Sequence, residues 1–192
     1  MQVFVQQPDA QLLAWLEERR RLGLDRRDEV WNGVLHVVPP ASYSHQRLAS
    51  KLLVVLAPIS ERLGLEVVYE AGVFDRPGRW NNYRVPDLIV TSPESASERG
   101  IEARAELVIE VLSPNDESRQ KFEFYASCGV SEVWVVHPVT RAIEVYVLDE
   151  GSYREQPVAP DGTIEAPRLA LALRVVDGPK LRVIWAGGSA EI

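Results

Sequence analysis

Residues 106–137, ELVIEVLSPNDESRQKFEFYASCGVSEVWVVH, decide the fold. The stretch opens with an apolar run, ELVIEVLS (106–113), and closes with a second one, EVWVVH (132–137). Between them, residues 116–127 read as a helix, and Gly129 can supply its left-handed C-terminal cap. Two strands that bracket a helix predict a crossover unit in a mixed sheet with helices on both faces.

The segments on either side extend this pattern. Upstream, LEVVYEAGVF (65–74) and VPDLIVTS (85–92) have strand character, and downstream AIEVYVL (142–148) does so as well. The tail holds short strand candidates at 168–176 and 181–185, whose pairing the sequence leaves open.

The first third of the chain predicts two helices and a hairpin. We expect a helix at 9–21, with arginines in its last turn, and a hairpin whose turn is Asn32-Gly33. A longer helix is expected at 44–63, with Ser44 as its N-cap and a kink at Pro58. The chain has no repeat, linker or low-complexity block, so we expect a single domain over 1–192.

Composition narrows the class of protein. Of the 192 residues, 46% are hydrophobic and 26% are charged, which is typical of a globular domain. The single cysteine, the lack of a bilayer-length apolar run and the lack of a signal-like N-terminus indicate a cytoplasmic protein without membrane contact. The net charge of −7 argues against a general nucleic-acid coat, but not against a nuclease whose acidic site holds a cation.

Two carboxylates stand in apolar surroundings. Glu110 lies inside ELVIEVL, and Asp87 lies at the entry to VPDLIV. An unpaired buried carboxylate is costly, and two oxygen ligands on neighbouring strands suit Mg²⁺ or Mn²⁺. The alternatives are a turn aspartate after proline for Asp87 and a buried salt bridge to arginine or lysine for Glu110.

Other residues could complete the site. Lys121, on the helix after Glu110, could face a phosphate or position the attacking water, or it could simply be a solvent-facing lysine. Glu70 could add a third carboxylate or face water at a strand end, and His45 could reach the site or remain a hydrogen-bonded structural histidine.

Some features are weaker candidates. Glu29 ranks below the residues above, and Asp116 is explained as an acid in the first turn of a helix. The loop RWNNYR (79–84) is basic and aromatic and could contact nucleic acid, although a plain turn explains it equally well.

A family resemblance rests on VPDLIV (85–90), ELVIEVLSPND (106–116) and GVSEVWVVHPVTRAIEVYVL (129–148), with a lysine and a tyrosine between the last two. Together these motifs resemble the Uma2 family, also called DUF820, nucleases of the PD-(D/E)XK restriction-endonuclease-like superfamily. The resemblance covers residues 28–148 and includes EVWNGVL and SHQRLASKL.

The resemblance implies an α/β fold, with a restriction-endonuclease-like three-layer α/β/α core around a central mixed β-sheet. It also implies a cation held by Asp87 and Glu110. The superfamily places a lysine two residues after this glutamate, where this chain has Leu112. Lys121 matches the substitute lysine of Uma2-like sequences, and His45 matches a histidine usual in the family. The departure at Leu112 bears on catalysis more than on metal binding.

We therefore expect a metal-dependent endonuclease that hydrolyses phosphodiester bonds of nucleic acid, most of all DNA. Mg²⁺ or Mn²⁺ is its expected cofactor, with Asp87, Glu110 and Glu70 as metal ligands and Asp87, Glu110, Lys121 and His45 as catalytic residues. A homodimer or higher homo-oligomer would present two sites to a duplex. The alternative is a catalytically inactive endonuclease-fold domain used for binding or assembly.

Overall fold

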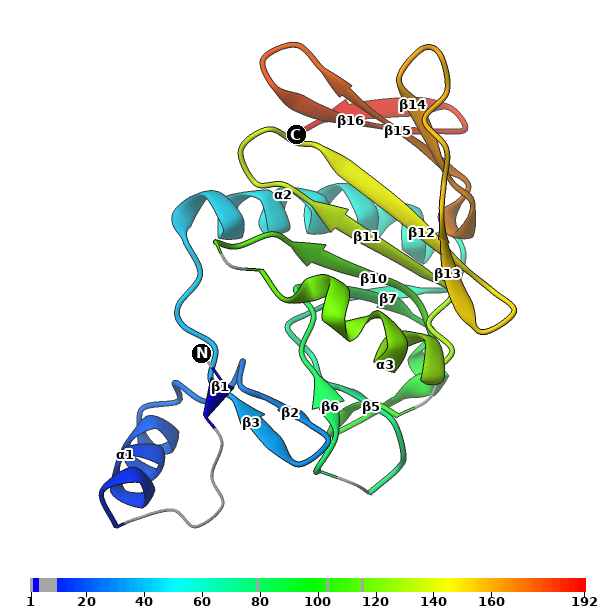
Figure 1. Cartoon of the computed structure of the whole chain (residues 1–192). Coiled ribbons are helices and arrows are strands. Elements are labelled where there is room, and N and C mark those ends of the chain that lie inside the picture. The colour runs from blue at the N-terminus through cyan, green and yellow to red at the C-terminus, as the bar shows by residue number, and fades with distance from the viewer. Residues whose placement is uncertain (1, 4–9, 79, 103, 115) are drawn as a thin grey trace.

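A six-stranded mixed sheet forms the centre of the protein (Figure 1). The computed structural model describes residues 2–3, 10–78, 80–102, 104–114 and 116–192. The order of the central sheet is β13–β12–β11–β10–β7–β4. Its strands are β4 (Glu66–Tyr69), β7 (Leu88–Thr91), β10 (Ala105–Val111), β11 (Glu132–Val136), β12 (Ile143–Asp149) and β13 (Ser152–Glu155).

The crossover predicted from residues 106–137 is confirmed. Strands β10 and β11 pair in parallel, with Glu110 opposite Val135, and the other pairings of this sheet are antiparallel. The connection is a 3₁₀ turn, η2 (Ser118–Lys121), followed by the short helix α3 (Phe122–Ser127). The α-helix is thus shorter than the predicted 116–127, and Gly129 follows it at φ +71° as expected of a C-terminal cap.

Helices cover the two faces of this sheet (Figure 1). Helix α2 (Tyr43–Glu61) packs Leu48, Leu52 and Leu56 into the larger core cluster, and α3 packs Phe124 and Tyr125 into the core on the other face. The predicted N-cap Ser44 is wrong. Ser42 holds the extended backbone conformation that precedes a helix, and its hydroxyl accepts a hydrogen bond from the His45 N–H at 3.3 Å.

A four-stranded antiparallel sheet shares the core with α2. Its strands, in spatial order, are β14 (Thr163–Ala166), β15 (Leu171–Val176), β16 (Lys180–Trp185) and β17 (Gly188–Glu191). The tail strands predicted at 168–176 and 181–185 correspond to β15 and β16, which pair with each other. Residues 167–169 form a 3₁₀ turn, η3 (Pro167–Leu169), instead of the start of a strand.

A third sheet lies beside the core, below it in Figure 1. In spatial order its strands are β1 (Gln2–Val3), β3 (Val34–His36), β2 (Glu29–Trp31), β6 (Tyr83–Arg84), β5 (Val73–Phe74), β9 (Gly100–Ile101) and β8 (Ala96–Ser97). The predicted hairpin at Asn32-Gly33 is confirmed, with φ +49° and +87° at these two residues. A further 3₁₀ turn, η1 (Pro93–Ser95), precedes β8.

The expected single strand over 65–74 is wrong, because the segment divides between two sheets. Glu70 takes a left-handed φ of +48°, so the chain leaves the central sheet after β4 and enters the third sheet at β5. Helix α1 (Ala10–Arg21) matches the predicted helix, except that residue 9 lies outside the described residues. No helix in the described part of the chain combines the length and apolar character needed to cross a membrane.

Candidate active site

A cleft of about 820 Å³ opens at one edge of the central sheet. Its walls come from the β2–β3 hairpin, the segment 37–42 ahead of α2, the entry to β7, the end of β10 and the turn η2. Because β7 and β10 are antiparallel, the start of one and the end of the other meet at this edge. The candidate residues Asp87, Glu110, Lys121 and His45 all line the cleft.

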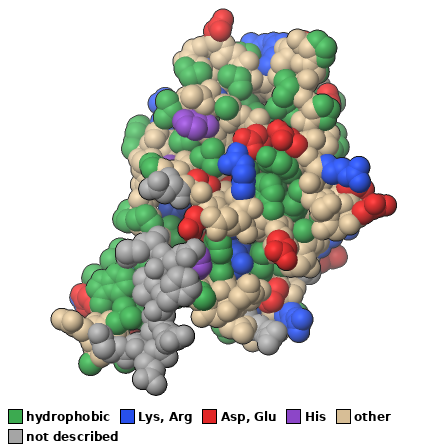
Figure 2. Space-filling view, viewed as in Figure 1, with side chains coloured by type: hydrophobic (Ala, Val, Ile, Leu, Met, Phe, Trp, Pro, Cys, Tyr) green, Lys and Arg blue, Asp and Glu red, His purple; other side chains and the backbone are tan. Residues whose placement is uncertain are grey.

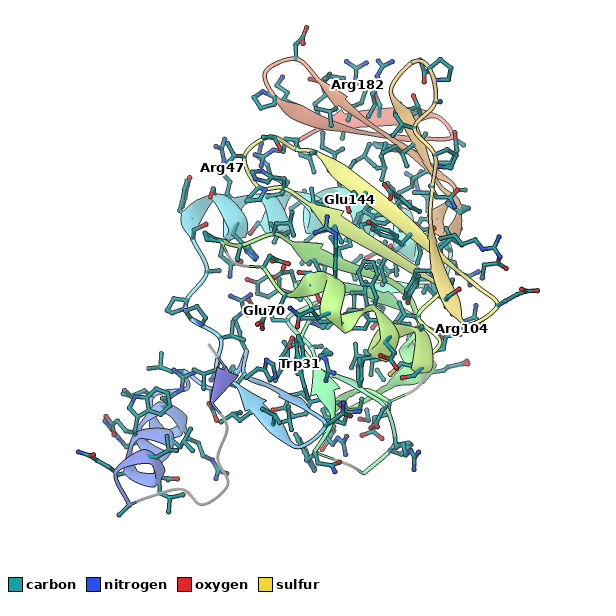
Figure 3. All side chains as sticks on the ribbon, viewed as in Figure 1. Trp31, Arg47, Glu70, Arg104, Glu144 and Arg182 are labelled. Atoms are coloured by element: carbon teal, nitrogen blue, oxygen red, sulfur yellow. The ribbon has the colours of Figure 1, made fainter. Side chains whose placement is uncertain are left out.

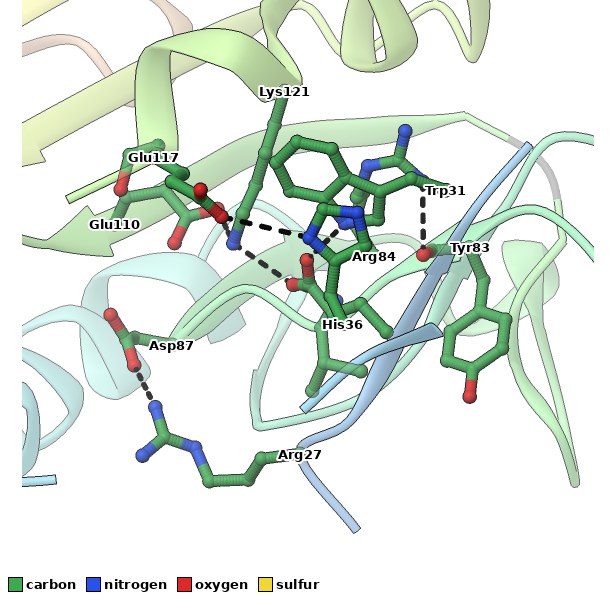
Figure 4. Close-up of polar contacts among 12 residues, drawn as sticks. Arg27, Trp31, His36, Tyr83, Arg84, Asp87, Glu110, Glu117 and Lys121 are labelled. Carbon is green, nitrogen blue, oxygen red and sulfur yellow. Dashed lines mark hydrogen bonds and ion pairs between the residues drawn. The ribbon is translucent and has the colours of Figure 1, made fainter. Parts of the chain in front are cut away.

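Asp87 lies next to Glu110 across the β7–β10 ladder. Leu88 pairs with Ile109, so the residue before one lies beside the residue after the other. The Asp87 side chain is only 3% exposed, and both of its carboxylate oxygens have polar partners. Its Oδ2 accepts the Val111 N–H at 2.7 Å and lies 3.2 Å from Nε2 of His45, and its Oδ1 accepts from Arg27 Nη2 at 3.0 Å (Figure 4).

Glu110 is 4% exposed and accepts two hydrogen bonds on one oxygen. The Tyr125 hydroxyl donates to its Oε1 at 2.5 Å, and Lys121 Nζ donates at 3.0 Å. Burial, together with the charges of Asp87 and Glu29, raises the pKa of Glu110 to about 7 against the opposing effects of Lys121 and Tyr125. The ionised carboxylate is therefore less favoured here than in water.

Lys121 supplies the positive charge that lies between two carboxylates. Its Nζ donates to Glu110 Oε1 at 3.0 Å and to Glu29 Oε1 at 2.9 Å. Burial alone would lower the pKa of Lys121, but the charges of Glu110 and Glu29 outweigh burial and raise it, so the ammonium stays protonated. Figure 4 shows the amine pointing from η2 into the cleft toward Glu110.

Glu29 joins Asp87 and Glu110 in a cluster of carboxylates in the cleft, although the sequence placed it among the weaker candidates. Besides Lys121, it binds the Trp31 indole N–H at 2.6 Å and the Val85 N–H at 2.8 Å. Its position on the first strand of a predicted hairpin carries no signal of this, because a hairpin's sequence does not say which part of the sheet it covers. Arg27, just before that strand, was missed for the same reason.

His45 and Glu70 flank Asp87 in different ways. His45 projects from the first turn of α2 toward Asp87, and its second ring nitrogen, Nδ1, is buried without a hydrogen-bond partner among the described residues. Glu70 does not contact Glu110: it pairs with Arg27 Nε at 2.8 Å and accepts from Gln46 Nε2 at 3.2 Å. Arg27 therefore separates the two carboxylates Glu70 and Asp87.

The weaker candidates have structural contacts. Asp116 accepts the N–H groups of Ser113 and Ser118 at 2.9 and 2.7 Å, which fixes the turn after β10. In the loop at 79–84, Trp80 is exposed, and residue 79 lies outside the described residues. Arg84 turns inward and stacks its guanidinium on the rings of Trp31 and Phe124, with 4.5 and 4.1 Å to the ring centres.

The carboxylates of Asp87 and Glu110 lie side by side in this cleft, and carboxylate oxygens are the donors that Mg²⁺ and Mn²⁺ prefer. Within the described ranges, no three His, Cys, Asp or Glu side chains are grouped closely enough to enclose an ion as they stand. The second oxygen of Glu110 accepts no hydrogen bond from the described residues, so its lone pairs remain available. The donor set thus fits a cation held by two carboxylates and water, provided that Arg27 gives up its ion pair with Oδ1 of Asp87.

Comparison with known proteins agrees with this fold. The Uma2 family, described as "Putative restriction endonuclease", matches residues 10–176. A crystal structure of "a putative nuclease belonging to DUF820" from Anabaena variabilis ATCC 29413 is similar over 74% of this chain and 83% of that chain, with a TM-score of 0.59 and 18% identity. No curated protein matches the chain.

The structural likeness confirms the expected restriction-endonuclease-like fold, a three-layer α/β/α core around a mixed sheet. The family match spans nearly all of the chain from α1 through β15. By this match the chain belongs to the Uma2 family of restriction-endonuclease-like proteins.

Proposed function

We propose that this protein is a metal-dependent nuclease that hydrolyses phosphodiester bonds, with DNA as its first expected substrate. The carrying observation is the pair Asp87 and Glu110, buried side by side at the wall of an 820 Å³ cleft with Lys121 Nζ 3.0 Å from Glu110. A divalent cation is the ligand that such a pair of carboxylates fits best.

Asp87 and Glu110 would hold Mg²⁺ or Mn²⁺. Such an ion supplies a Lewis acid for the phosphate and lowers the pKa of bound water. Glu70 is assigned an outer position, because its ion pair with Arg27 must open before it can join the other carboxylates. The raised pKa of Glu110 supports a cation at Asp87 and Glu110, since its positive charge would offset the neighbouring negative charges that help to raise this pKa.

The chain's own residues have separate tasks. Lys121 keeps its proton and can donate hydrogen bonds to the negative charge that develops on the phosphate. Tyr125 fixes the Glu110 carboxylate through a 2.5 Å hydrogen bond. His45 lies 3.2 Å from Asp87 and orients it, together with the Val111 N–H. Leu112 occupies the position where the superfamily has its lysine, so Lys121 is assigned that role from the next element.

The test is cleavage of plasmid, single-stranded DNA and RNA with Mg²⁺ or Mn²⁺, combined with calorimetric measurement of Mn²⁺ binding. Asp87→Asn keeps the size of the side chain and should abolish both cleavage and Mn²⁺ binding. The matched control is Asp149→Asn, which changes an exposed aspartate at the end of β12. Cleavage that survives in Asp87→Asn would refute the proposal.

A non-catalytic binding or assembly domain is the competing function. Its support is that both oxygens of Asp87 are already engaged, by Arg27 on one side and by His45 and Val111 on the other. This alternative predicts no cleavage of any of the three substrates by the wild-type protein. We also propose a homodimer, which would bring one site to each strand of a duplex, and a cytoplasmic location where DNA is accessible.

A further inference from the structure

The turn between β11 and β12 (residues 137–142) holds an unusual arginine. Arg141 is only 9% exposed and takes a left-handed φ of +62°, which is uncommon for a residue with a side chain. Its Nη1 donates to the Pro138 carbonyl, and its Nε is buried without a partner among the described residues. Backbone strain and an unpaired buried donor both cost free energy, so this position is a candidate for a functional role.

Two further cations lie on the N-terminal half of α2. Arg47 is exposed and close enough to Arg141 that its charge adds to burial in lowering the pKa of Arg141. Figure 3 labels Arg47 where the N-terminal half of α2 passes the β11–β12 turn. Lys51 follows one helical turn after Arg47, on the same side of the helix. We call Arg47, Lys51 and Arg141 the α2 basic cluster.

The α2 basic cluster has no carboxylate within ion-pair distance among the described residues. None of its three members forms an ion pair with any residue that the structure describes. This is notable in a chain with 28 acidic and 21 basic residues and a net charge of −7. On the face in Figure 2, acidic and basic side chains are interspersed, so clustering of one sign is the exception. Like charges without a counter-ion repel, and a bound anion would remove that repulsion.

The cluster lies at the same edge of the central sheet as the carboxylates. Val111 pairs with Val136 in the parallel β10–β11 ladder, so the turn that follows β11 lies beside the end of β10. Strand β11 is two places from β7 in the sheet, which is about 10 Å at roughly 4.8 Å for each strand. A DNA strand carries a phosphate about every 3.4 Å along the helix axis. A strand engaged at Asp87 and Glu110 would therefore bring neighbouring phosphates to the cluster.

We propose that the α2 basic cluster binds backbone phosphates of the nucleic acid, a few nucleotides away from the bond that is cut. The substrate strand would run from the cleft past the N-terminal half of α2 to the β11–β12 turn. Arginine offers a planar fork of donors to phosphate oxygens, and Lys51 adds a point charge. These contacts position the substrate and read no base sequence. This inference rests on the proposed nuclease function and names how that site holds its substrate.

The first experiment measures binding of a fluorescein-labelled 20-base-pair duplex by anisotropy, with Ca²⁺ in place of Mg²⁺. Arg47→Ala should weaken binding about fivefold, as expected for a charge-assisted surface contact. The slope of log affinity against log salt should flatten by about 0.9 for each phosphate that the variant no longer neutralises. Arg62→Ala is the matched control, because Arg62 is an exposed arginine at the C-terminal end of the same helix.

A second variant tests the buried member. Arg141→Asn introduces a residue type that tolerates the left-handed backbone, so the turn should keep its conformation. It should weaken duplex binding to a similar degree. If Arg47→Ala and Arg141→Asn both bind the duplex as tightly as the wild type, or if the wild type binds no duplex, the inference is overturned.

Kinetics separate this inference from the nuclease proposal. With plasmid as substrate, Arg47→Ala should raise KM about fivefold and leave kcat unchanged. With bis(p-nitrophenyl) phosphate, a diester too small to reach the cluster, Arg47→Ala should match the wild type while Asp87→Asn is inactive. Loss of activity on both substrates in Arg47→Ala would refute a positioning role. Duplex binding that depends on Arg47 in a protein without any cleavage would support the cluster and refute the nuclease.

Thermal stability gives an independent readout. Since the charge of Arg47 opposes that of Arg141 in the free protein, Arg47→Ala should unfold at the same or a higher temperature than the wild type. Weaker duplex binding without a loss of stability would show that Arg47 acts in binding and not in folding. A lower Tm in parallel with weaker binding would instead indicate a structural role and overturn the inference.

Discussion

Two buried glutamates on neighbouring parallel strands differ in how their charge is accommodated. Glu110 is near the end of β10 and Glu132 is at the start of β11, and neither is more than 4% exposed. Burial raises the pKa of both side chains. Glu132 accepts from two donors, the Trp134 indole at 2.6 Å and the Arg168 N–H at 3.0 Å. Glu110 also accepts from two donors, but it faces two further carboxylates, Asp87 and Glu29.

The difference shows that burial alone does not identify a functional carboxylate. Glu132 borders a cavity of about 440 Å³ that also has Arg104 and Arg168 in its wall, so its charge has cations nearby. At Glu110, burial and the charges of Asp87 and Glu29 raise the pKa against the opposing charge of Lys121, and the larger cleft gives a cation access. Negative charge that is concentrated, buried and accessible is the signature of a metal site.

The largest expected effect is on the cleavage rate, which should distinguish Glu110 from Glu132. Glu110→Gln should lower the cleavage rate by about 10³-fold, because it removes a proposed metal ligand and the charge that holds Lys121. Glu132→Gln, the same substitution one strand away, should keep the rate within about threefold. Plasmid cleavage at saturating Mn²⁺ measures both. Equal reductions in the two variants would contradict the division into a functional and a structural glutamate.

The next effect concerns the cation between the carboxylates. Lys121→Met should cost about 3 kcal/mol of unfolding free energy in urea, because two buried carboxylates would have no shared partner. Mn²⁺ should restore more stability in this variant than in the wild type. The control is Lys180→Met on β16, which removes an exposed pair with Glu191 at little cost. Equal costs in both lysine variants would refute the charge-balancing role.

A smaller effect is expected for the structural glutamate. Glu132→Ala should cost about 2 kcal/mol, because it leaves the buried indole N–H of Trp134 and the partly buried backbone N–H of Arg168 without their acceptor. Urea unfolding followed by tryptophan fluorescence measures the cost. Glu165→Ala, an exposed glutamate on β14, serves as the control and should be nearly neutral. A stability equal to the control would show that Glu132 is not held by these bonds.

The smallest effect is a dependence on pH. The pKa of Glu132 is raised in the folded protein, so the folded state binds its proton more tightly than the unfolded state does. Its contribution to stability therefore falls as the pH rises above the unfolded value of about 4.5 toward the folded pKa. The difference in unfolding free energy between wild type and Glu132→Gln should shift against the wild type over this range. A difference that stays constant from about pH 4 to about pH 8 would contradict the raised pKa.

Local sequence signals were sufficient for the elements that carry their own pattern. Helix α2 follows from its apolar periodicity, the Asn32-Gly33 hairpin from its turn residues, and the crossover at 106–137 from two apolar runs around a helix that ends before Gly129. Asp87 and Glu110 lie together because they come from adjacent strands, as expected, while their role as metal ligands stays a prediction.

The remaining parts depend on tertiary packing. Glu29 and Arg27 join the cluster only because the hairpin folds over the end of β10, and no local pattern fixes that placement. The strand break at Glu70 comes from a left-handed backbone at a residue with no turn preference. Strands β14 and β17, TIEA and GSAE, are four residues long and hold at most one large apolar side chain each, so they were not predicted.

The ion pairs of Arg27 bear on whether the protein folds before or after it binds a metal ion. Arg27 reaches Glu70 and Asp87, and Lys121 reaches Glu110 and Glu29, so protein cations offset much of the cluster's charge. Small zinc domains unfold when a chelator removes their ion, because metal binding supplies their folding energy. Here the fold can form before any metal ion binds. Chelation should therefore abolish activity reversibly without unfolding the protein.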